Sequence, residues 1–518
     1  MSRTKNVSRN IIWGLLNKAS SLGLPFISRT VMIYTLGMNY VGLGSLFSSI
    51  LSVLSFAELG IGSALVFSMY KPIEFGDDNK VSALLNLYRR AYRTIGAIIL
   101  FAGLLIAPFL HLFVASDVPE DINLQVLFFL YLINNLIGYF LYAYKQALFV
   151  ASQRVDKISK VQLVLNTIAS LSQIVILLTI RNYYVYVIVL PIITLLNNLI
   201  ISWLADKSFP QYKCTGRVSK LEIKEIEKKI GGMLFQKIGS IILTSADTLV
   251  ISAYLGLNIL GVYTGYYYVI NALFGISSVL QQAVIPSVGN SIITDSSDKN
   301  LCDFKKINFL YHWFSIWCCA SLLGIYQPFI RLWQGEENMF SDGTVILFVI
   351  YFFVYKMGDV SWIYREALGF WWEARFIPFT SSVVNLVINI ILVQYIGLPG
   401  VLISTIIALT LVNFPWSSRV LFLSYFRSKI EWIIYMRSTF FYFLSMLVVS
   451  IITYVICMCV PEDGFVNLIV RVFICIIIPN VILVAISLNN PEFKSAGIFI
   501  LRIMPSKIIP RFVEKYFI

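Results

Sequence analysis

Long apolar stretches separated by short polar segments run through the whole chain. The first covers residues 11 to 36 and exceeds the roughly 20 residues that a helix needs to cross a bilayer. No small-residue cleavage site follows it, so we expect this helix to be retained. The hydropathy pattern predicts an all-α polytopic membrane protein with fourteen transmembrane helices, near 11–36, 41–70, 94–116, 124–144, 161–180, 184–205, 232–254, 259–285, 307–330, 343–364, 377–396, 399–418, 438–460 and 465–488.

The sequence also repeats itself at an offset of 219 residues. The octet LGMNYVGL at residues 36–43 returns as LGLNILGV at 255–262. At the same offset Lys18 falls on Lys237 and Tyr92 falls on Tyr311, and with one residue of drift the pentapeptide at 144–148 falls on the one at 364–368. A period this long indicates a duplicated domain, because solenoid repeats are much shorter.

Each copy holds six predicted spans, and an even number makes both copies enter the membrane in the same direction. This is a parallel internal repeat, as in two-lobed transporters. We therefore predict two six-helix lobes and two additional C-terminal helices, with boundaries at 1–205 (N-lobe), 206–231 (cytoplasmic linker), 232–424 (C-lobe), 425–488 (final helix pair) and 489–518 (cytoplasmic tail). In the linker, Ser219 and Glu222 have capping-box spacing before a run of isoleucines on one helical face. An amphipathic helix on the inner surface is expected there, with a basic tether as the alternative.

Composition and charge agree with a membrane protein and orient it. Hydrophobic residues make up 58% of the chain and charged residues 13%, with a mean hydropathy of +0.80. Of the 40 Lys and Arg residues, 33 fall in the polar segments on one side of the predicted membrane. The positive-inside rule makes that side cytoplasmic and places both termini there. The net charge of +13 is thus explained by topology without invoking nucleic acid.

This chain lacks the residue patterns that several classes of chemistry require. There is no Gly-x4-Gly-Lys-Ser/Thr loop for nucleotide phosphates, and no predicted loop is large enough for a catalytic domain. The seven cysteines and two histidines have no metal-ligand spacing, so no metal or cofactor is expected. We therefore predict a transporter and not an enzyme.

Three basic residues within the predicted spans are candidates for binding an anion. Ionisable side chains inside a membrane are costly unless they face a cavity or a partner. Lys18 and Arg29 are eleven residues apart on the first helix, which returns them to one face about 16 Å apart. Lys237 is the repeat equivalent of Lys18, so the two lysines are expected to face each other across the lobe interface. Snorkelling to the cytoplasmic surface is the alternative for both lysines.

Other ionisable residues in the spans could couple an ion or pair structurally. Asp247 is deep in the seventh span and is expected either to balance Arg29 or to bind a cation. Lys356 and Asp359 are three residues apart, so a local structural ion pair is favoured for them. Glu58 lies beside glycines that permit a bend, where it could sense a proton or pair with an arginine. Arg471 is expected to snorkel or to face lipid.

The motifs of the first two spans resemble a known family. Asn17-Lys18, Arg29, Tyr34-Thr35-Leu36-Gly37, Gly42 and the segment AELGIGSA at 57–64 are similar to those of polysaccharide flippases of the Wzx type. These belong to the multidrug/oligosaccharidyl-lipid/polysaccharide (MOP) exporter superfamily, and the arrangement of six, six and two helices extends the resemblance to nearly the whole chain.

The resemblance implies a MATE-like fold with a central cavity open alternately to either side of the bacterial cytoplasmic (inner) membrane. It also implies a substrate, an undecaprenyl-pyrophosphate-linked oligosaccharide, that is moved to the outer leaflet for O-antigen, capsule or exopolysaccharide synthesis. A pyrophosphate in a low-dielectric interior needs fixed cations, a role that Lys18, Arg29 and Lys237 suit. By analogy, H⁺ or Na⁺ drives the cycle, the final helix pair guides the lipid tail, and polysaccharide assembly proteins are candidate partners.

Two other functions stay open at this point. A drug/cation antiporter of the same superfamily would also be duplicated, although it usually has twelve helices and an anionic cavity. An integral membrane polysaccharide polymerase or ligase would be equally hydrophobic, but it needs a catalytic loop that the sequence does not offer.

Overall fold

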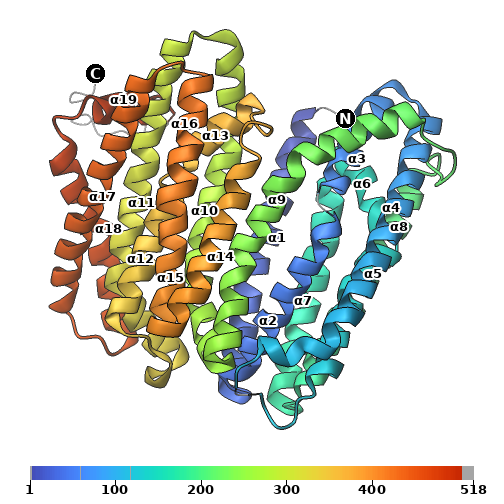
Figure 1. The fold of residues 1–518 in the computed structure, drawn as a ribbon, viewed down its shortest axis with the longest axis horizontal. Coiled ribbons are helices and arrows are strands. Elements are labelled where there is room, and N and C mark those ends of the chain that lie inside the picture. The colour runs from blue at the N-terminus through green and yellow to red at the C-terminus, as the bar shows by residue number, and fades with distance from the viewer. Residues whose placement is uncertain (1–2, 59, 117, 504–518) are drawn as a thin grey trace. The chain divides into compact units, whose positions relative to one another are not determined.

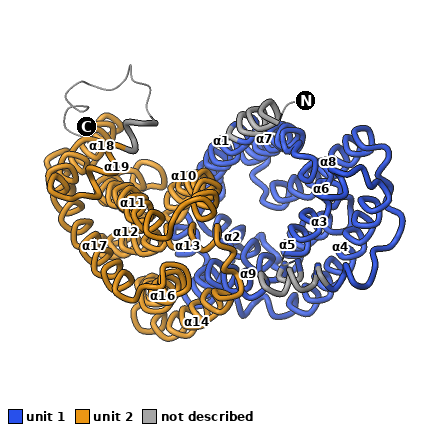
Figure 2. Tube along the Cα trace, turned by 90° about the horizontal axis from the view of Figure 1, so that it is seen from above, with its two compact units in different colours: residues 1–265 blue, residues 266–518 orange. Residues whose placement is uncertain are grey.

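A computed structural model of the chain describes residues 3–58, 60–116 and 118–503, and the elements assigned in these ranges are all helices. The helices form two compact units, Met1–Gly265 and Tyr266–Ile518 (Figures 1 and 2). The expected all-α architecture is therefore confirmed. The finer boundaries of lobes, linker and final helix pair stay a prediction.

Unit 1 is built from helices that pack on one another along their lengths. Helix α1 packs along α7, α5 and α7 both pack on α8, and α2 packs on α9. The elements of this unit are α1 (Arg3–Thr35), α2 (Met38–Leu54), η1 (Ser55–Glu58), α3 (Ile61–Phe75), α4 (Asp78–Ile106), η2 (Ala107–Phe113), α5 (Leu124–Phe140), η3 (Ala143–Lys145), α6 (Gln146–Ala151), α7 (Val155–Thr179), α8 (Tyr183–Ser208), α9 (Lys220–Leu255) and the first turns of α10 (Leu257–Thr294).

In unit 2 the long helix α11 is the central element. It packs against α12, α17, α18 and α19, while α14 packs on α15 (Figure 1). The elements are the rest of α10, α11 (Ser297–Gln334), η4 (Glu336–Asn338), α12 (Asp342–Lys356), α13 (Asp359–Leu368), α14 (Phe376–Ile396), α15 (Leu398–Ile407), the π-helical η5 (Ala408–Asn413), α16 (Phe414–Ser424), α17 (Lys429–Met458), α18 (Phe465–Ser487) and α19 (Pro491–Ile503).

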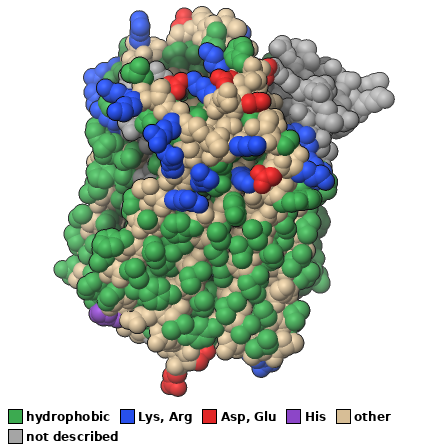
Figure 3. Space-filling model, turned by 90° about the vertical axis from the view of Figure 1, so that its right-hand side faces the viewer, with side chains coloured by type: hydrophobic (Ala, Val, Ile, Leu, Met, Phe, Trp, Pro, Cys, Tyr) green, Lys and Arg blue, Asp and Glu red, His purple; other side chains and the backbone are tan. Residues whose placement is uncertain are grey.

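Each predicted span overlaps one or more helices of the structure. In the described part of the chain, eleven helices are long and apolar enough to cross a membrane, and the bent pair α5 and α6 makes twelve. The two further predicted spans correspond to α1 and to the interrupted pair α2 and α3. Fourteen crossings with cytoplasmic termini remain a prediction. On the face in Figure 3, Lys and Arg side chains gather at one end, beyond a broad belt of hydrophobic side chains, as the positive-inside rule requires.

Two predicted spans of unit 1 are interrupted by backbone in the left-handed region. Between α2 and α3 the chain passes through the short helix η1 and through Gly60, whose φ is 85°. Between α5 and α6 it passes Tyr142 at φ 63°, and the two helices are bent by 48°. Glycine adopts this conformation without a steric penalty, whereas tyrosine does not. The glycines beside Glu58 thus lie at a break between two helices, and the bend expected there stays a prediction.

The repeated octets pack against each other. A Cβ atom added to Gly42 would overlap the carbonyl oxygen of Leu257, and one added to Gly261 would overlap the carbonyl oxygen of Met38. Gly42 and Gly261 are equivalent in the repeat, as are Met38 and Leu257, so the contact is reciprocal between the copies. Small residues let helix backbones approach closely in membrane proteins. This explains why both copies carry glycine here.

The end of the predicted linker is tied to α4. Ser219 caps the next helix, since its hydroxyl oxygen accepts from the Glu222 amide, as the capping-box spacing predicts. That helix is α9, which continues into the seventh span without a break and is therefore longer than the separate surface helix we expected. Glu222 forms an ion pair with Lys80 of α4, and Asn86 donates to the carbonyl of Gly216 at 2.8 Å. These contacts fix the segment before α9 on unit 1.

Candidate functional site

Arg29 lies on α1 where the two copies meet. Its side chain is partly buried, and its guanidinium donates to the carbonyl oxygen of Thr264 at 3.2 Å and to the hydroxyl oxygen of the same residue. Thr264 follows the octet of the second copy by two residues, so Arg29 lies directly beside the glycine contact described above. Both of these acceptors are neutral groups, and a guanidinium offers several donors that suit an anion such as phosphate.

The two repeat-related lysines differ from Arg29 in exposure. Lys18 on α1 and Lys237 on α9 are both exposed side chains. Next to Lys18, the Asn17 amide donates to Gln162 of α7 at 3.1 Å, which fixes this end of α1 on α7. Asp247, two to three turns further along α9 than Lys237, is 7% exposed. The facing of Lys18 and Lys237 and the pairing of Asp247 with Arg29 stay predictions.

Glu58 ends the short helix η1 and is held by two tyrosines from two other helices. Tyr92 of α4 donates to Oε1 at 2.6 Å, and Tyr139 of α5 donates to Oε2 at 2.7 Å. Tyr88 in turn donates to the Tyr92 hydroxyl at 3.1 Å. Both carboxylate oxygens therefore have a neutral donor, and the break between α2 and α3 is fastened to α4 and α5. Within the described part of the chain, tyrosines thus take the place of the arginine partner that we considered for Glu58.

Lys356 and Asp359 form an ion pair in unit 2, with 4% and 7% of each residue exposed. Ser277 of α10 donates to Oδ2 of Asp359 at 3.2 Å, and the Lys356 ammonium lies 5.5 Å from the centre of the Phe274 ring. The pair spans the short break between α12 and α13. A compensated pair this deeply buried favours the structural interpretation given for it from the spacing.

The two carboxylates occupy exchanged positions in the repeat. At the offset of 219 Glu58 corresponds to Ser277, and at 220 Tyr139 corresponds to Asp359. In the first copy a tyrosine donates to a glutamate, and in the second a serine donates to an aspartate across the equivalent pair of helices. The sequence analysis missed this relation. Extending the offset of 220 from the pentapeptide back to Gly138 and Gly358, which correspond to each other, would have aligned Tyr139 with Asp359.

Arg471 corrects an expectation. It is 2% exposed on α18, so it neither snorkels nor faces lipid. Its guanidinium donates to the carbonyl oxygens of Gly324 at 3.3 Å and Val460 at 2.6 Å, and its Nη2 lies 3.9 Å from Oε1 of Glu462. Gly324 leaves the space that brings α11 close to α18. Hydropathy alone could not separate this buried arginine from one at the membrane surface.

The fold is that of a multi-pass helical membrane protein with ionisable side chains inside its predicted spans. The chain resembles the lipid II flippase MurJ in an inward closed conformation (TM-score 0.67, 17% identity, 92% of this chain and 99% of that one). It also resembles an inward-facing multidrug resistance MATE family transporter of the MOP superfamily (TM-score 0.62, 13% identity, 79% and 96%). A third similar structure is a mutant of the Vibrio cholerae MATE transporter VcmN (TM-score 0.53, 13% identity, 83% and 100%).

A family model described as "Polysaccharide biosynthesis protein" matches residues 41–307, which is more than half of the chain. The chain belongs to this family. Among curated proteins, none matches the sequence. The chain therefore combines membership of a polysaccharide biosynthesis family with a fold similar to those of a lipid II flippase and of MATE family transporters, and its apolar helices are those of a multi-pass membrane protein.

Proposed function

We propose that this protein translocates an undecaprenyl-pyrophosphate-linked oligosaccharide from the inner to the outer leaflet of the bacterial cytoplasmic membrane, for O-antigen, capsule or exopolysaccharide synthesis. The observation that carries the proposal is membership of a polysaccharide biosynthesis family by a chain with the fold of a lipid II flippase. A transporter in such a pathway needs a membrane-bound sugar carrier as its substrate.

The cations of unit 1 suit the headgroup of such a substrate. Arg29 is partly buried beside Thr264, while Lys18 and Lys237 are exposed. A pyrophosphate entering a low-dielectric path needs fixed positive charge, and Arg supplies planar, multiple donors to phosphate oxygens. In this proposal the lysines capture the headgroup near the cytoplasmic surface and Arg29 binds it deeper.

The lipid tail needs an apolar path, and unit 2 offers one. A cavity of about 430 Å³ lies between α11, α17 and α18, with Phe309, Trp313, Phe441, Leu444 and Leu483 among its lining residues. Tyr442, Ser487 and Asn490 give it a polar edge. An isoprenoid tail in this groove is stabilised mainly by van der Waals packing, because the surrounding lipid is as apolar as the tail itself. We assign the guidance of the tail to this groove.

For the coupling ion we propose H⁺, with Glu58 as its site. Tyr92 and Tyr139 each donate to one carboxylate oxygen, so both oxygens are acceptors while Glu58 is ionised. Protonation makes one oxygen a donor, so the tyrosine hydroxyl on that oxygen must turn from donor to acceptor. We assign the mechanical effect of the proton to this rearrangement of the contacts that fasten the break at Gly60 to α4 and α5. Asp359, in contrast, is already paired with the charge of Lys356.

The test is complementation of a deletion strain. Without the protein, the lipid-linked oligosaccharide should accumulate on the cytoplasmic leaflet and surface polysaccharide should be lost. Arg29→Ala, or Lys18→Ala with Lys237→Ala, should fail to restore export at normal expression, whereas Lys494→Ala on α19 should restore it. Normal export by the Arg29 variant and by the double lysine variant would refute the role proposed for these three cations. Normal surface polysaccharide in the deletion strain, together with lost drug resistance, would favour the antiporter instead.

The proton site is tested separately in proteoliposomes. Glu58→Gln should abolish the dependence of transport on a pH gradient, and Tyr139→Phe should shift that dependence while leaving transport active. Unchanged pH-gradient dependence in Glu58→Gln would overturn the assignment, and a requirement for a sodium gradient in the native protein would replace H⁺.

A further inference from the structure

A second cavity in unit 2 has an apolar inner end and a charged rim. It encloses about 450 Å³ between α10, α11 and α13. Leu280, Val284 and Phe314 line one end, and Ser291, Asp303 and Lys306 line the other. Ser291 and Leu280 are eleven residues apart on α10, which separates the two ends by about 16 Å along the helix. The polar end is at the edge of the predicted membrane and the apolar end reaches into it.

Tyr311 places a hydroxyl without a partner in the wall of this cavity. The residue is 8% exposed, and among the described residues its hydroxyl has no hydrogen-bond partner. The equivalent Tyr92 donates to Glu58, but the position of Glu58 is Ser277 in the second copy. The donor has thus been retained while its acceptor has been lost. A buried polar group without a hydrogen bond is destabilising, so an acceptor on a ligand would stabilise this site.

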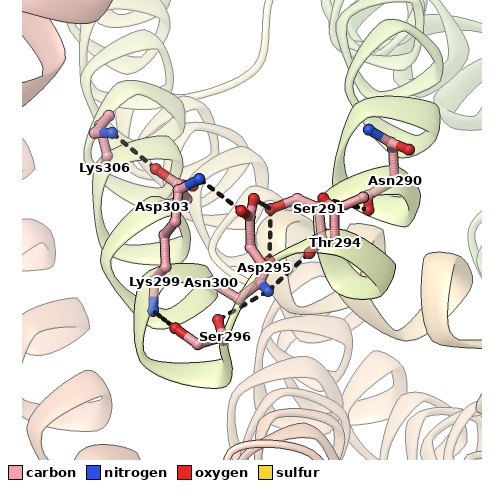
Figure 4. A network of polar contacts seen from close by, with 9 residues as sticks. All are labelled: Asn290, Ser291, Thr294, Asp295, Ser296, Lys299, Asn300, Asp303 and Lys306. Atoms are coloured by element: carbon pink, nitrogen blue, oxygen red, sulfur yellow. Dashed lines mark hydrogen bonds and ion pairs between the residues drawn. The ribbon is translucent and has the colours of Figure 1, made fainter.

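The rim of the cavity carries both signs of charge. Lys306 donates to Asp303 at 2.8 Å, and Lys299 donates to Asp295 at 2.7 Å nearby (Figure 4). Asn300 fixes this turn by donating to the carbonyls of Ser291 and Ser296, both at 3.1 Å. A simple anion at Lys306 would also meet the carboxylate of Asp303. A molecule with a positive and a negative group can pair with both.

We propose that this cavity binds a zwitterionic phospholipid with a primary amine headgroup, of the phosphatidylethanolamine class. Its phosphate pairs with Lys306 and its ammonium with Asp303, and an ester carbonyl accepts from Tyr311. The first part of an acyl chain fills the end near Leu280 and Phe314. The charge pattern of the rim, the buried tyrosine hydroxyl and the polarity gradient all select this one kind of ligand. The site is independent of the proposed transport substrate.

The test is native mass spectrometry of the purified full-length protein in detergent, titrated separately with dioleoyl phosphatidylethanolamine, dioleoyl phosphatidylglycerol and undecaprenyl phosphate. The ethanolamine lipid should bind roughly tenfold more tightly than the glycerol lipid, which corresponds to a difference in binding free energy of about 1.4 kcal/mol. Lys306→Gln and the nearly isosteric Tyr311→Phe should each weaken binding several-fold and reduce the headgroup preference. Val279→Trp, on an exposed face of α10, should not.

Equal affinity for both phospholipids, or native affinity in Lys306→Gln and Tyr311→Phe, would overturn the proposal. Preferential binding of undecaprenyl phosphate that these substitutions abolish would reassign the cavity to the polyprenyl headgroup. Each variant is also checked by gel filtration, and Tyr311→Phe keeps the measurement informative if a charge variant fails to fold.

Discussion

The ion pair between Lys356 and Asp359 gives a quantitative test of structural pairing against ion coupling. Asp359→Asn leaves the Lys356 ammonium, 4% exposed, beside the Phe274 ring without its carboxylate. Lys356→Met leaves the Asp359 carboxylate with Ser277. Removing one partner of a buried ion pair typically costs about 3–5 kcal/mol, and we expect about 3 kcal/mol for each substitution because these contacts compensate in part.

The double variant Lys356→Met/Asp359→Asn should be more stable than either single variant. It leaves no uncompensated buried charge, the methionine fills the space along the lysine stem, and the asparagine can still accept from Ser277. Replacing a whole buried pair is often nearly neutral, so we expect a loss of about 1 kcal/mol.

The assay is thermal unfolding in detergent, followed by tryptophan fluorescence, with export measured on the same variants. The expected order of melting temperatures, from highest to lowest, is native protein, double variant, single variants. Melting of the double variant below both single variants would refute the compensation argument. A stable double variant that exports normally would assign the pair a structural role, and a stable one that fails to export would assign it to transport.

Three further predictions use other contacts. Gly42→Ala should lower stability by about 1–3 kcal/mol because its Cβ overlaps Leu257, whereas Gly138→Ala, with nothing within 4 Å, should not; equal melting temperatures would contradict this. Arg471→Met should be tolerated better than Arg471→Ala in gel filtration, because methionine fills the volume that alanine leaves empty. The hydrogen bond from Lys80 lowers the pKa of Glu222 below its ordinary value of 4.5. The ion pair therefore contributes fully above that value and is lost as the pH falls through the lowered pKa. The protection factors of residues 213–222, which correct for the pH dependence of intrinsic amide exchange, should therefore fall at low pH in the native protein and lose this dependence in Glu222→Gln.

Much of the fold could be predicted because the relevant signals are local along the chain. Apolar runs predicted where the helices lie, and the glycine-containing segment beside Glu58 coincides with the break between α2 and α3. The capping box predicted where α9 begins, but not that it continues into the seventh span, since a polar first part and an apolar second part can form one helix. The spacing of three residues also predicted the pairing of Lys356 with Asp359.

The candidate site was less predictable because it depends on helices far apart in sequence. Thr264 lies 235 residues from Arg29, and no local pattern indicates that they meet. Tyr139 lies 81 residues from Glu58, so no local pattern indicates that a tyrosine is its partner. An arginine partner was therefore an equally reasonable expectation. Arg471 has the hydropathy context of a snorkelling residue, and only the packing of α11 on α18 reveals that it is buried.

The sequence by itself determined that this is a duplicated, multi-pass helical membrane protein with basic residues concentrated on one side, because bilayer thickness and the positive-inside rule act on each segment separately. It also determined which residues are equivalent between the copies. Only the tertiary structure decided how equivalent residues are used. The glycine of each octet packs against the backbone of the other octet. The carboxylate lies at the break between α2 and α3 in one copy and at the break between α12 and α13 in the other. The role of a charged side chain inside a membrane depends on the groups that contact it, and the packing of helices far apart in sequence decides which groups these are.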